Sequence, residues 1–288
     1  MFSIIIAAYN DWGPLDQCLQ SVAAQIPGPD FEVILVDDGS EEPAPEFILR
    51  WTRHYPLTIV RQSHTGIPGA RNRGVGLSRG SVLLFVDADC RLEANCLTAL
   101  CSAISRNPKY NCFQLRLTGE CTTLVGRAEQ LRLLTLQQHF LQPDGCIRYL
   151  NTSGFAIRRT AVNQAELFDS TALRGEDTLL LTTLMRKGDL PFFTPDAVVR
   201  HSISLTLGQC LHKDIRSAYQ ERKTFDIIDS KQLKKIQLNN KERLRLLLAM
   251  WRTSGRRSIG RPAWFVLVTR EALERIVILA SGCLPRGS

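Results

Sequence analysis

Carboxylates in two short motifs of the first 90 residues are the side chains best suited to chemistry. Asp37 and Asp38 belong to Val-Asp-Asp-Gly-Ser, and Asp87 and Asp89 belong to Val-Asp-Ala-Asp. Asp87 and Asp89, one residue apart, can face one hard divalent cation, with a bound diphosphate and waters completing six oxygen ligands. A solvated turn is the alternative, because Asp and Gly are common in turns. Two such clusters, each after a strand-like run, favour a cation site.

Two further groups could complete a catalytic set. Glu176 and Asp177 follow Gly175 and open a helical pattern, where a carboxylate could accept the proton of an attacking hydroxyl. Acidic residues also stabilise a helix N-terminus without any catalytic role. His201 ends a strand-like run and could join a metal site, although a lone histidine is more often a surface or packed residue.

The segment Gly66–Gly74 carries several glycines at the expected start of a helix, together with Arg71 and Arg73. Backbone N–H groups and a guanidinium at such a place could hold phosphate. The glycines do not form G-x-G-x-x-G, and the chain contains no G-x-x-x-x-G-K-[ST]. The sequence therefore does not indicate a dinucleotide-binding dehydrogenase, a P-loop ATPase or a P-loop kinase.

These residues need a sheet that brings distant parts of the chain together. Short runs rich in Ile and Val alternate with helical patterns, which predicts an α/β fold with a mostly parallel sheet flanked by helices. Ligands of such sheets bind beyond the carboxyl ends of the strands. Tyr9 and both carboxylate clusters follow strands, so we expect them at one edge. The expected strands are 2–8, 31–36, 57–60 and 82–86, and the expected helices are 14–25, 69–77 and 93–105.

The ordered motifs resemble those of the family 2 glycosyltransferases of GT-A fold. The resemblance covers about residues 1–205 and rests on Ile-Ile-Ala-Ala-Tyr-Asn, Val-Asp-Asp-Gly-Ser, Gly-x-x-x-Ala-Arg-Asn, Val-Asp-Ala-Asp and Gly-Glu-Asp. It implies a Rossmann-like GT-A fold and a nucleotide-diphospho-sugar donor, with a UDP-sugar as the first expectation. It also implies a Mn²⁺ or Mg²⁺ ion and inversion at the anomeric carbon.

The resemblance further implies a role for each matching residue. Asp177 would be the general base, and Glu176 beside it would help to position the acceptor. Asp89, Asp87 and His201 would form the metal site. The donor-binding residues would be Ala7, Tyr9 and Asp38 around the nucleobase, where Asp38 would accept a hydrogen bond from the imide of a uracil or thymine ring. Arg71 would lie near the nucleobase and the phosphates, and Asp87 would lie at the ribose.

Processive polysaccharide synthases of this family carry a Gln-x-x-Arg-Trp motif after the residue that acts as the general base. The nearest segment here, residues 220–223, is Gln-Glu-Arg-Lys and does not match, so we expect a single sugar transfer. Two other functions stay open at this stage. One is a nucleotidyltransferase on a related α/β sheet, and the other is a non-catalytic scaffold that binds a nucleotide-sugar.

Charge divides the 288 residues into two regions. The net charge is +8, yet residues 205–288 alone hold 17 Lys and Arg against 7 Asp and Glu. We therefore expect a GT-A catalytic domain over residues 1–205 and a basic helical region over residues 206–288. Helical patterns at 241–252 and 263–280 flank an arginine-rich loop in that region.

Three interpretations of residues 206–288 remain open. They could form a helical cap with a solvated basic face, an interfacial helix pair on an anionic membrane surface, or a nucleic-acid surface. Aromatic residues for base stacking do not interleave with the basic run, so we expect no nucleic-acid partner. The acceptor is not identified, and a lipid-linked acceptor is compatible with the second interpretation.

Cysteine usage and the first residues bear on location. The nine cysteines form no C-x-x-C pair, and the apolar start of the chain lacks the basic flank of a signal peptide. No apolar run approaches the ~20 residues that span a bilayer. We expect reduced thiols and a cytoplasmic protein that the basic region could hold on the inner face of the membrane.

Overall fold

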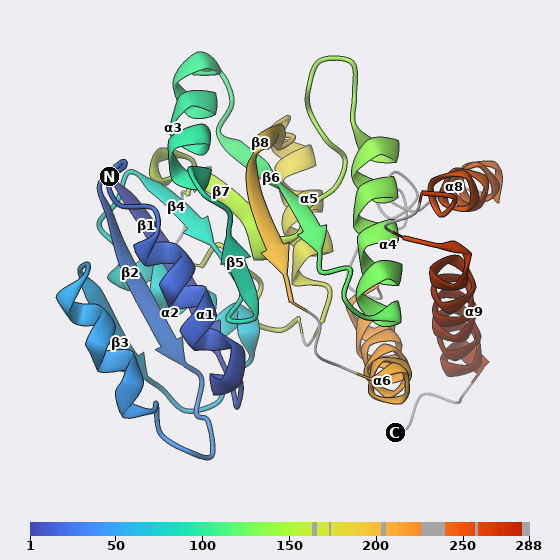
Figure 1. The fold of residues 1–288 in the computed structure, drawn as a ribbon, viewed down its shortest axis with the longest axis horizontal. Coiled ribbons are helices and arrows are strands. Elements are labelled where there is room, and N and C mark those ends of the chain that lie inside the picture. Colours follow the sequence, from blue (N-terminus) through green and yellow to red (C-terminus); the bar gives the residue numbers. More distant parts are fainter. Residues whose placement is uncertain (163–165, 173, 203–205, 226–239, 257–258, 284–288) are drawn as a thin grey trace. The chain divides into compact units, whose positions relative to one another are not determined.

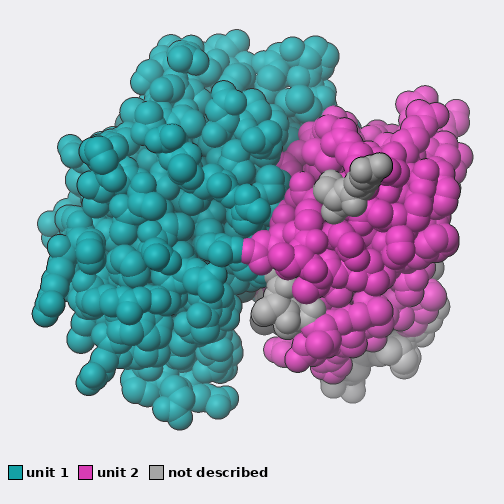
Figure 2. All heavy atoms as spheres, viewed as in Figure 1, with its two compact units in different colours: residues 1–118, 140–171, 176–202 teal, residues 119–139, 172–175, 203–288 magenta. Residues whose placement is uncertain are grey.

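The computed structural model describes residues 1–288 except 163–165, 173, 203–205, 226–239, 257–258 and 284–288 (Figure 1). Contacts divide the chain into two compact units, shown in different colours in Figure 2. Unit 1 comprises residues 1–118, 140–171 and 176–202, and unit 2 comprises residues 119–139, 172–175 and 203–288. The boundary that the sequence predicts at residue 205, between a catalytic domain and a basic helical region, remains a prediction. By contacts, residues 119–139 group with the C-terminal residues.

Unit 1 is built on a mixed sheet. Its strands are β1 Phe2–Ala8, β2 Phe31–Asp37, β3 Leu57–Arg61, β4 Val82–Phe85, β5 Cys90–Leu92, β6 Cys112–Gly119, β7 Phe155–Arg158 and β8 Phe192–His201. Among the described residues they form one eight-stranded sheet in the order β3-β2-β1-β4-β7-β6-β8-β5. Strands β3, β2, β1 and β4 are parallel. Strand β7 is antiparallel to β4 and β6, and β5 is antiparallel to β8. The expected α/β class is confirmed, and the antiparallel half completes it.

The helices of unit 1 begin close to the positions that the sequence predicts. They are α1 Trp12–Ala23, α2 Ile67–Leu77, α3 Cys96–Arg106 and α5 Glu176–Lys187, with the 3₁₀ turns η1 Glu46–Arg53, η2 Thr152–Gly154 and η3 Arg159–Ala161. The start of α2 follows Gly66, whose φ of 86° lies in the region that favours glycine, and Pro68 occupies the first helical turn. Asp11 precedes α1 at the N-cap position but makes no side-chain cap bond there.

Both faces of the parallel strands are covered, which explains their continuous apolar runs. Ile4, Ile5 and Ile6 of β1 alternate between the faces, and each is at most 1% exposed. Ile5 packs in one cluster with residues of α2 and α5, while α1 covers the opposite face of the sheet (Figure 1). Opposite sides for α1 and α2 are what right-handed crossovers require, because the two connections run in opposite directions across the sheet.

Unit 2 is helical. It contains α6 Leu207–Phe225, α8 Asn240–Thr253, α9 Arg261–Cys283 and all but the last residue of α4 Leu124–Phe140. Its core joins α4, α8 and α9 through Ala128, Leu131, Leu246, Met250, Ile259, Ala263 and Leu267. The arginine-rich loop expected before α9 lies partly outside the described residues, at 257–258. Within the described ranges, no helix has the length and apolarity needed to cross a membrane.

Candidate functional site

The parallel register brings three predicted segments to one edge of the sheet. Ala7 and Ala8 at the end of β1 lie beside Val36 and Asp37 of β2, and Ile5 lies beside Phe85 of β4. The residues that follow these strands therefore leave the sheet at similar levels. This places the Tyr9, Asp38 and Asp87 segments together at the carboxyl ends, where ligands of α/β sheets bind.

Arg71 joins two of the predicted motifs. Helix α2 carries it into the interior of unit 1, where it is 3% exposed. Its Nη2 donates to Asp87 Oδ1 at 2.7 Å, and its Nη1 donates to Glu176 Oε1 at 2.8 Å. Burial lowers the pKa of Arg71, but the two carboxylates outweigh burial and the guanidinium stays charged. Arg71 thus fixes the Asp87 segment against the first turn of α5.

Asp87 has a second partner from a distant turn. The Ser153 hydroxyl donates to its Oδ2 at 2.6 Å, so both carboxylate oxygens are held. Burial raises the pKa of Asp87, but Arg71 and Ser153 oppose burial more strongly and hold this pKa below its usual range. Asp87 is therefore a fixed negative charge, as a site for a cation or for donor hydroxyls requires.

Asp177 lies in the first turn of α5 and has the opposite pKa shift. The Thr152 hydroxyl donates to its Oδ1 at 2.8 Å. Burial and the adjacent Glu176 raise the pKa of Asp177 to about 7, against the lowering influence of Arg71 and Thr152. A carboxylate with such a pKa can accept a proton near neutral pH. Asp87 and Asp177 therefore have distinct protonation behaviour within one cluster.

The 3₁₀ turn Thr152–Gly154 connects these two carboxylates through its two hydroxyl groups. Asn151 caps the turn by accepting from the Ser153 N–H at 2.9 Å. The buried Gln114 side chain donates to the Gly154 carbonyl and accepts from the Asn151 N–H. Nothing in the local pattern of Gln114 signals this role, because its partners lie about 40 residues away in the chain.

A second group of ligand atoms lies at the β5–β8 pairing. His201 Nε2 is 3.0 Å from Asp89 Oδ2, and Cys90 is paired with His201 in the strand register. Ligand atoms of Asp89, Cys90 and His201 all lie within 4.8 Å of one another. Burial, followed by Asp89 and Asp87, raises the pKa of the Cys90 thiol well above its ordinary value. Carboxylate and imidazole are ligands that Mn²⁺ accepts, so Asp89 and His201 could hold this ion. The sequence predicted Asp89 and His201 together but missed Cys90.

Asp38 is buried and engaged with the loop that leads into α2. It accepts from Gln62 Nε2 at 2.8 Å, from the Thr65 N–H at 3.0 Å and from the Gly66 N–H at 2.8 Å. His64 Nδ1 lies 2.9 Å from the same carboxylate. The expected contact of Asp38 with a nucleobase therefore stays a prediction. In the structure, the hydrogen bonds of Asp38 order this loop.

Tyr9 and His64 form an exposed aromatic pair beside Asp38. Their ring centroids are 4.1 Å apart with an interplanar angle of 27°, and Tyr9 is 44% exposed. A flat aromatic surface of this kind can stack on a nucleobase. Sequence reasoning selected Tyr9 and Ala7 but missed His64, because the stacking partner comes from the loop after β3.

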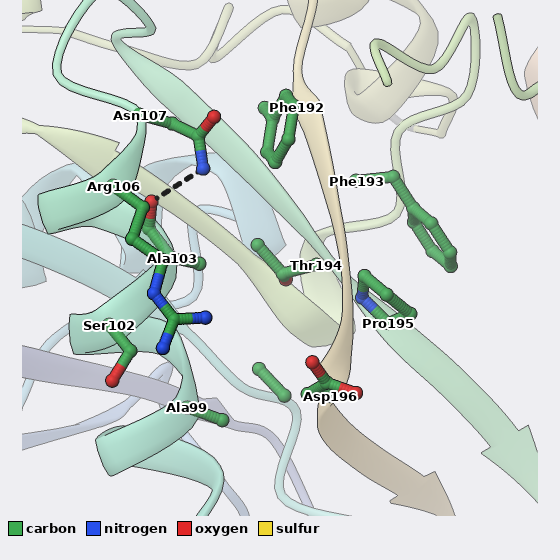
Figure 3. A pocket seen from close by; sticks show the side chains of 11 residues that line it. Ala99, Ser102, Ala103, Arg106, Asn107, Phe192, Phe193, Thr194, Pro195 and Asp196 are labelled. Atoms are coloured by element: carbon green, nitrogen blue, oxygen red, sulfur yellow. Dashed lines mark hydrogen bonds between the residues drawn. The ribbon is translucent and has the colours of Figure 1, made fainter. Parts of the chain in front are cut away.

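A separate pocket of about 310 Å³ lies between α3 and the first half of β8 (Figure 3). Its lining includes the exposed residues Arg106 and Asp196, and the Phe192 ring lies on the side of β8 that faces α3. None of the predicted site residues lines it, and His201 lies at the other end of β8. We assign it no part in the carboxylate cluster.

Comparison with known sequences identifies related proteins. A sequence profile described as glycosyl transferase family 2 matches residues 3–165. A PGL/p-HBAD biosynthesis glycosyltransferase of Mycobacterium bovis is 40% identical over 110 residues, which are 37% of this chain and 43% of that protein. An uncharacterized glycosyltransferase of Haemophilus influenzae is 34% identical over 113 residues, which are 38% of this chain and 37% of that protein. The matched part is less than half the length of each of these relatives.

Solved structures share the fold at low sequence identity. The mannosyltransferase PcManGT from Pyrobaculum calidifontis, in complex with GDP-Man and Mn²⁺, has a TM-score of 0.61 and 16% identity, covering 98% of this chain and 85% of that chain. S. aureus TarS 1–349, in complex with UDP, has a TM-score of 0.59 and 17% identity, covering 97% of this chain and 88% of that chain. These likenesses support the α/β architecture that the strand order describes.

Proposed function

Because the chain belongs to glycosyl transferase family 2, we propose that it moves one sugar from a UDP-sugar to an acceptor hydroxyl, with inversion at the anomeric carbon. The observation that carries the proposal is the Arg71 network. It holds Asp87, whose pKa is lowered, against the helix that presents Asp177, whose pKa is raised to about 7. A fixed anionic site and a neutral-pH base are the two groups that this transfer needs from the protein.

Asp177 is the proposed general base. Thr152 holds its Oδ1, which leaves Oδ2 to accept the proton of the acceptor hydroxyl. Glu176 is tied to Arg71 and raises the pKa of Asp177 by its negative charge. In this proposal Glu176 positions and tunes the base, and Asp177 alone takes the proton.

The donor would lie along the carboxyl edge of the sheet. The Tyr9–His64 pair, with Ala7 and Asp38 behind it, would form the base side. Asp89 and His201, with Asp87 nearby, would hold Mn²⁺ or Mg²⁺, which when bound stabilises negative charge on the leaving diphosphate as a Lewis acid. S. aureus TarS binds UDP-GlcNAc and PcManGT binds GDP-Man with Mn²⁺ on this fold, which supports a nucleotide-sugar donor.

Thermal unfolding tests donor and metal binding without requiring an acceptor. UDP-sugars with Mn²⁺ should raise the Tm of the full chain by a few degrees, since binding to the native state alone stabilises it. Asp89→Ala should abolish the Mn²⁺-dependent part of the shift. Asp196→Ala, an exposed carboxylate on β8, is the matched control and should keep it. An unchanged Tm with every nucleotide-sugar offered would refute donor binding.

Product analysis tests the reaction itself. Mass spectrometry with a panel of acceptors should show one added sugar and release of a nucleoside diphosphate. Asp177→Asn should retain the Tm shift and lose transfer by at least about 10²-fold, as for loss of a general base. Pyrophosphate release from a nucleoside triphosphate would instead identify a nucleotidyltransferase. Donor binding that leads to no transfer would identify a scaffold.

The lack of a Gln-x-x-Arg-Trp motif in the sequence supports the proposed addition of a single sugar, and serial addition in the product spectrum would contradict it. The acceptor, the cytoplasmic location and the membrane contact expected from the sequence remain predictions. The membrane contact depends on residues of unit 2 and does not depend on the transfer reaction.

A further inference from the structure

The exposed charge of unit 2 has one sign among the side chains whose exposure the structure describes. The exposed charged residues are Lys213, Arg216, Lys241, Arg245, Arg252, Arg256, Arg261 and Arg275. The acidic residues Glu120, Glu129, Asp214, Glu242, Glu271 and Glu274 are all buried or half-buried. Among the described side chains of unit 2, the fold therefore exposes only cations, while the carboxylates and some arginines are buried or half-buried.

The inward carboxylates have partners within the helical core. Asp214 of α6 accepts two hydrogen bonds from Arg270 of α9, at 2.6 and 3.0 Å. Glu129 of α4 accepts from Arg132. These contacts use acidic residues in interior pairs, so the described outer surface of unit 2 stays strongly positive. A surface of this kind fits an anionic partner.

The same surface exposes apolar side chains in a helical stripe. Leu244, Leu248 and Trp251 lie at i, i+4 and i+7 of α8 and are 60%, 50% and 39% exposed. Phe265 of α9 is 58% exposed, and its ring centroid lies 6.3 Å from that of Trp251. The α8–α9 patch, defined as Leu244, Leu248, Trp251 and Phe265, is thus continuous across two helices.

Arginines surround this patch. The Arg261 guanidinium lies 3.8 Å from the centroid of the Trp251 ring. Arg245 and Arg252 are exposed on α8 next to Leu244 and Trp251 in the chain. Arginine can keep its charged group at the lipid headgroups while its stem lies along apolar surface, and Trp favours the same interfacial zone.

We propose that the α8–α9 patch of unit 2 docks on an anionic lipid bilayer, with the two helices lying in the interface. Leu, Trp and Phe would enter the headgroup and acyl boundary, and the arginines would contact anionic headgroups. The exposed apolar stripe matches the acyl boundary of a bilayer, and the exposed arginines beside it match anionic headgroups.

Vesicle co-sedimentation of the full chain tests the proposal. We expect binding to vesicles of phosphatidylcholine mixed with phosphatidylglycerol, weak binding to pure phosphatidylcholine, and a decrease in binding as salt rises. Each basic residue near an anionic surface is worth about fivefold in affinity, so Arg245→Gln with Arg252→Gln should weaken binding about 25-fold. Leu248→Ser with Phe265→Ser should weaken it at least about tenfold through the apolar contribution.

Matched variants in unit 1 control for general surface effects. Arg53→Gln and Leu49→Ser alter exposed residues of η1 and should leave vesicle binding unchanged. Circular dichroism and Tm should show that all variants remain folded. The proposal is wrong if the chain ignores phosphatidylglycerol, or if the patch variants bind like the parent. It is also wrong if sedimentation reveals a dimer that Phe265→Ser dissociates while vesicle binding is absent, since the patch would then join two copies.

Discussion

At the residue scale, a carboxylate works as a base near neutral pH only when its surroundings raise its pKa toward that pH. Burial and Glu176 do this for Asp177, while Arg71 and Thr152 act in the opposite direction, and the result is a pKa of about 7. Asp177 is protonated below that pH and cannot then accept a proton. The transfer rate should accordingly fall as the pH drops through about 7.

Two substitutions should move this pH dependence in opposite directions. Glu176→Gln removes a like charge and should lower the apparent pKa in the profile of kcat/KM. Thr152→Val removes a hydrogen bond that favours the carboxylate and should raise the pKa by about one to two units, since such bonds are worth about 1.5–3 kcal/mol. The measurement is kcat/KM against pH at saturating Mn²⁺.

Thr182→Val is the control for these variants, because its hydroxyl lies on the same helix but donates to the Thr178 carbonyl. Its pH profile should match that of the parent. Shifts of the same sign for Glu176→Gln and Thr152→Val, or none, would show that Asp177 is not the group that titrates in the rate.

At the scale of the elements, α2 determines where Arg71 lies. The helix packs against β1, and Gly74 allows the close approach, because a Cβ at this position would lie 2.4 Å from Ile5 Cγ2. Asp38 accepts a hydrogen bond from the Gly66 N–H just before α2, and this bond holds the start of the helix in place. The predicted Gly-rich segment therefore serves helix packing as well as any phosphate contact.

Gly74→Ala should destabilise unit 1. Overpacking of a buried site costs about 1–3 kcal/mol, which exceeds the gain of up to about 1 kcal/mol from replacing a helical glycine by alanine. Gly76→Ala is the matched control in the same helix, since a Cβ there meets nothing within 4 Å, and it should be neutral or stabilising. Urea unfolding measures both. Equal effects of the two substitutions would contradict close packing of α2 on β1.

At the scale of the whole molecule, the chain combines a sheet unit that holds the carboxylate cluster with a helical unit that holds the basic surface. The helical unit relies partly on a buried ion pair, because Arg270 and Asp214 have side chains only 13% and 8% exposed. Glu129 Oε2 lies 3.9 Å from the same guanidinium. Glu129, Asp214 and Arg270 therefore connect α4, α6 and α9 through their charges, in addition to apolar packing.

Asp214→Ala should lower the free energy of unfolding of unit 2 by about 3–5 kcal/mol, because it leaves a buried guanidinium without its bidentate partner. Hydrogen exchange should become faster in α6 and α9 before it does in β1 and β2. Asp30→Ala, at an exposed site in unit 1, should change stability by no more than about 0.5 kcal/mol. Unchanged exchange in α6 and α9 would show that the pair contributes little.

Local patterns predicted much of unit 1. The strands beginning at Phe2, Phe31, Leu57 and Val82 are where the apolar runs placed them, because burial on both faces selects continuous Ile and Val. The carboxylate motifs follow those strands because turn chemistry is local as well. In unit 2, Arg270 bonds Asp214 on another helix, a contact that no local pattern signals.

The sequence by itself determined the α/β class and the family, and it predicted which residues would hold a cation or take a proton. The tertiary structure alone decided that Arg71 joins Asp87 to Glu176. It also decided that the Thr152 hydroxyl bonds Asp177 while the Ser153 hydroxyl bonds Asp87. The pairing of Cys90 with His201 likewise comes from the strand register. The physical reason is the separation along the chain over which each influence acts. Propensity and periodicity act over a few neighbouring residues, whereas these contacts depend on sheet register and helix packing between segments that are distant in the chain.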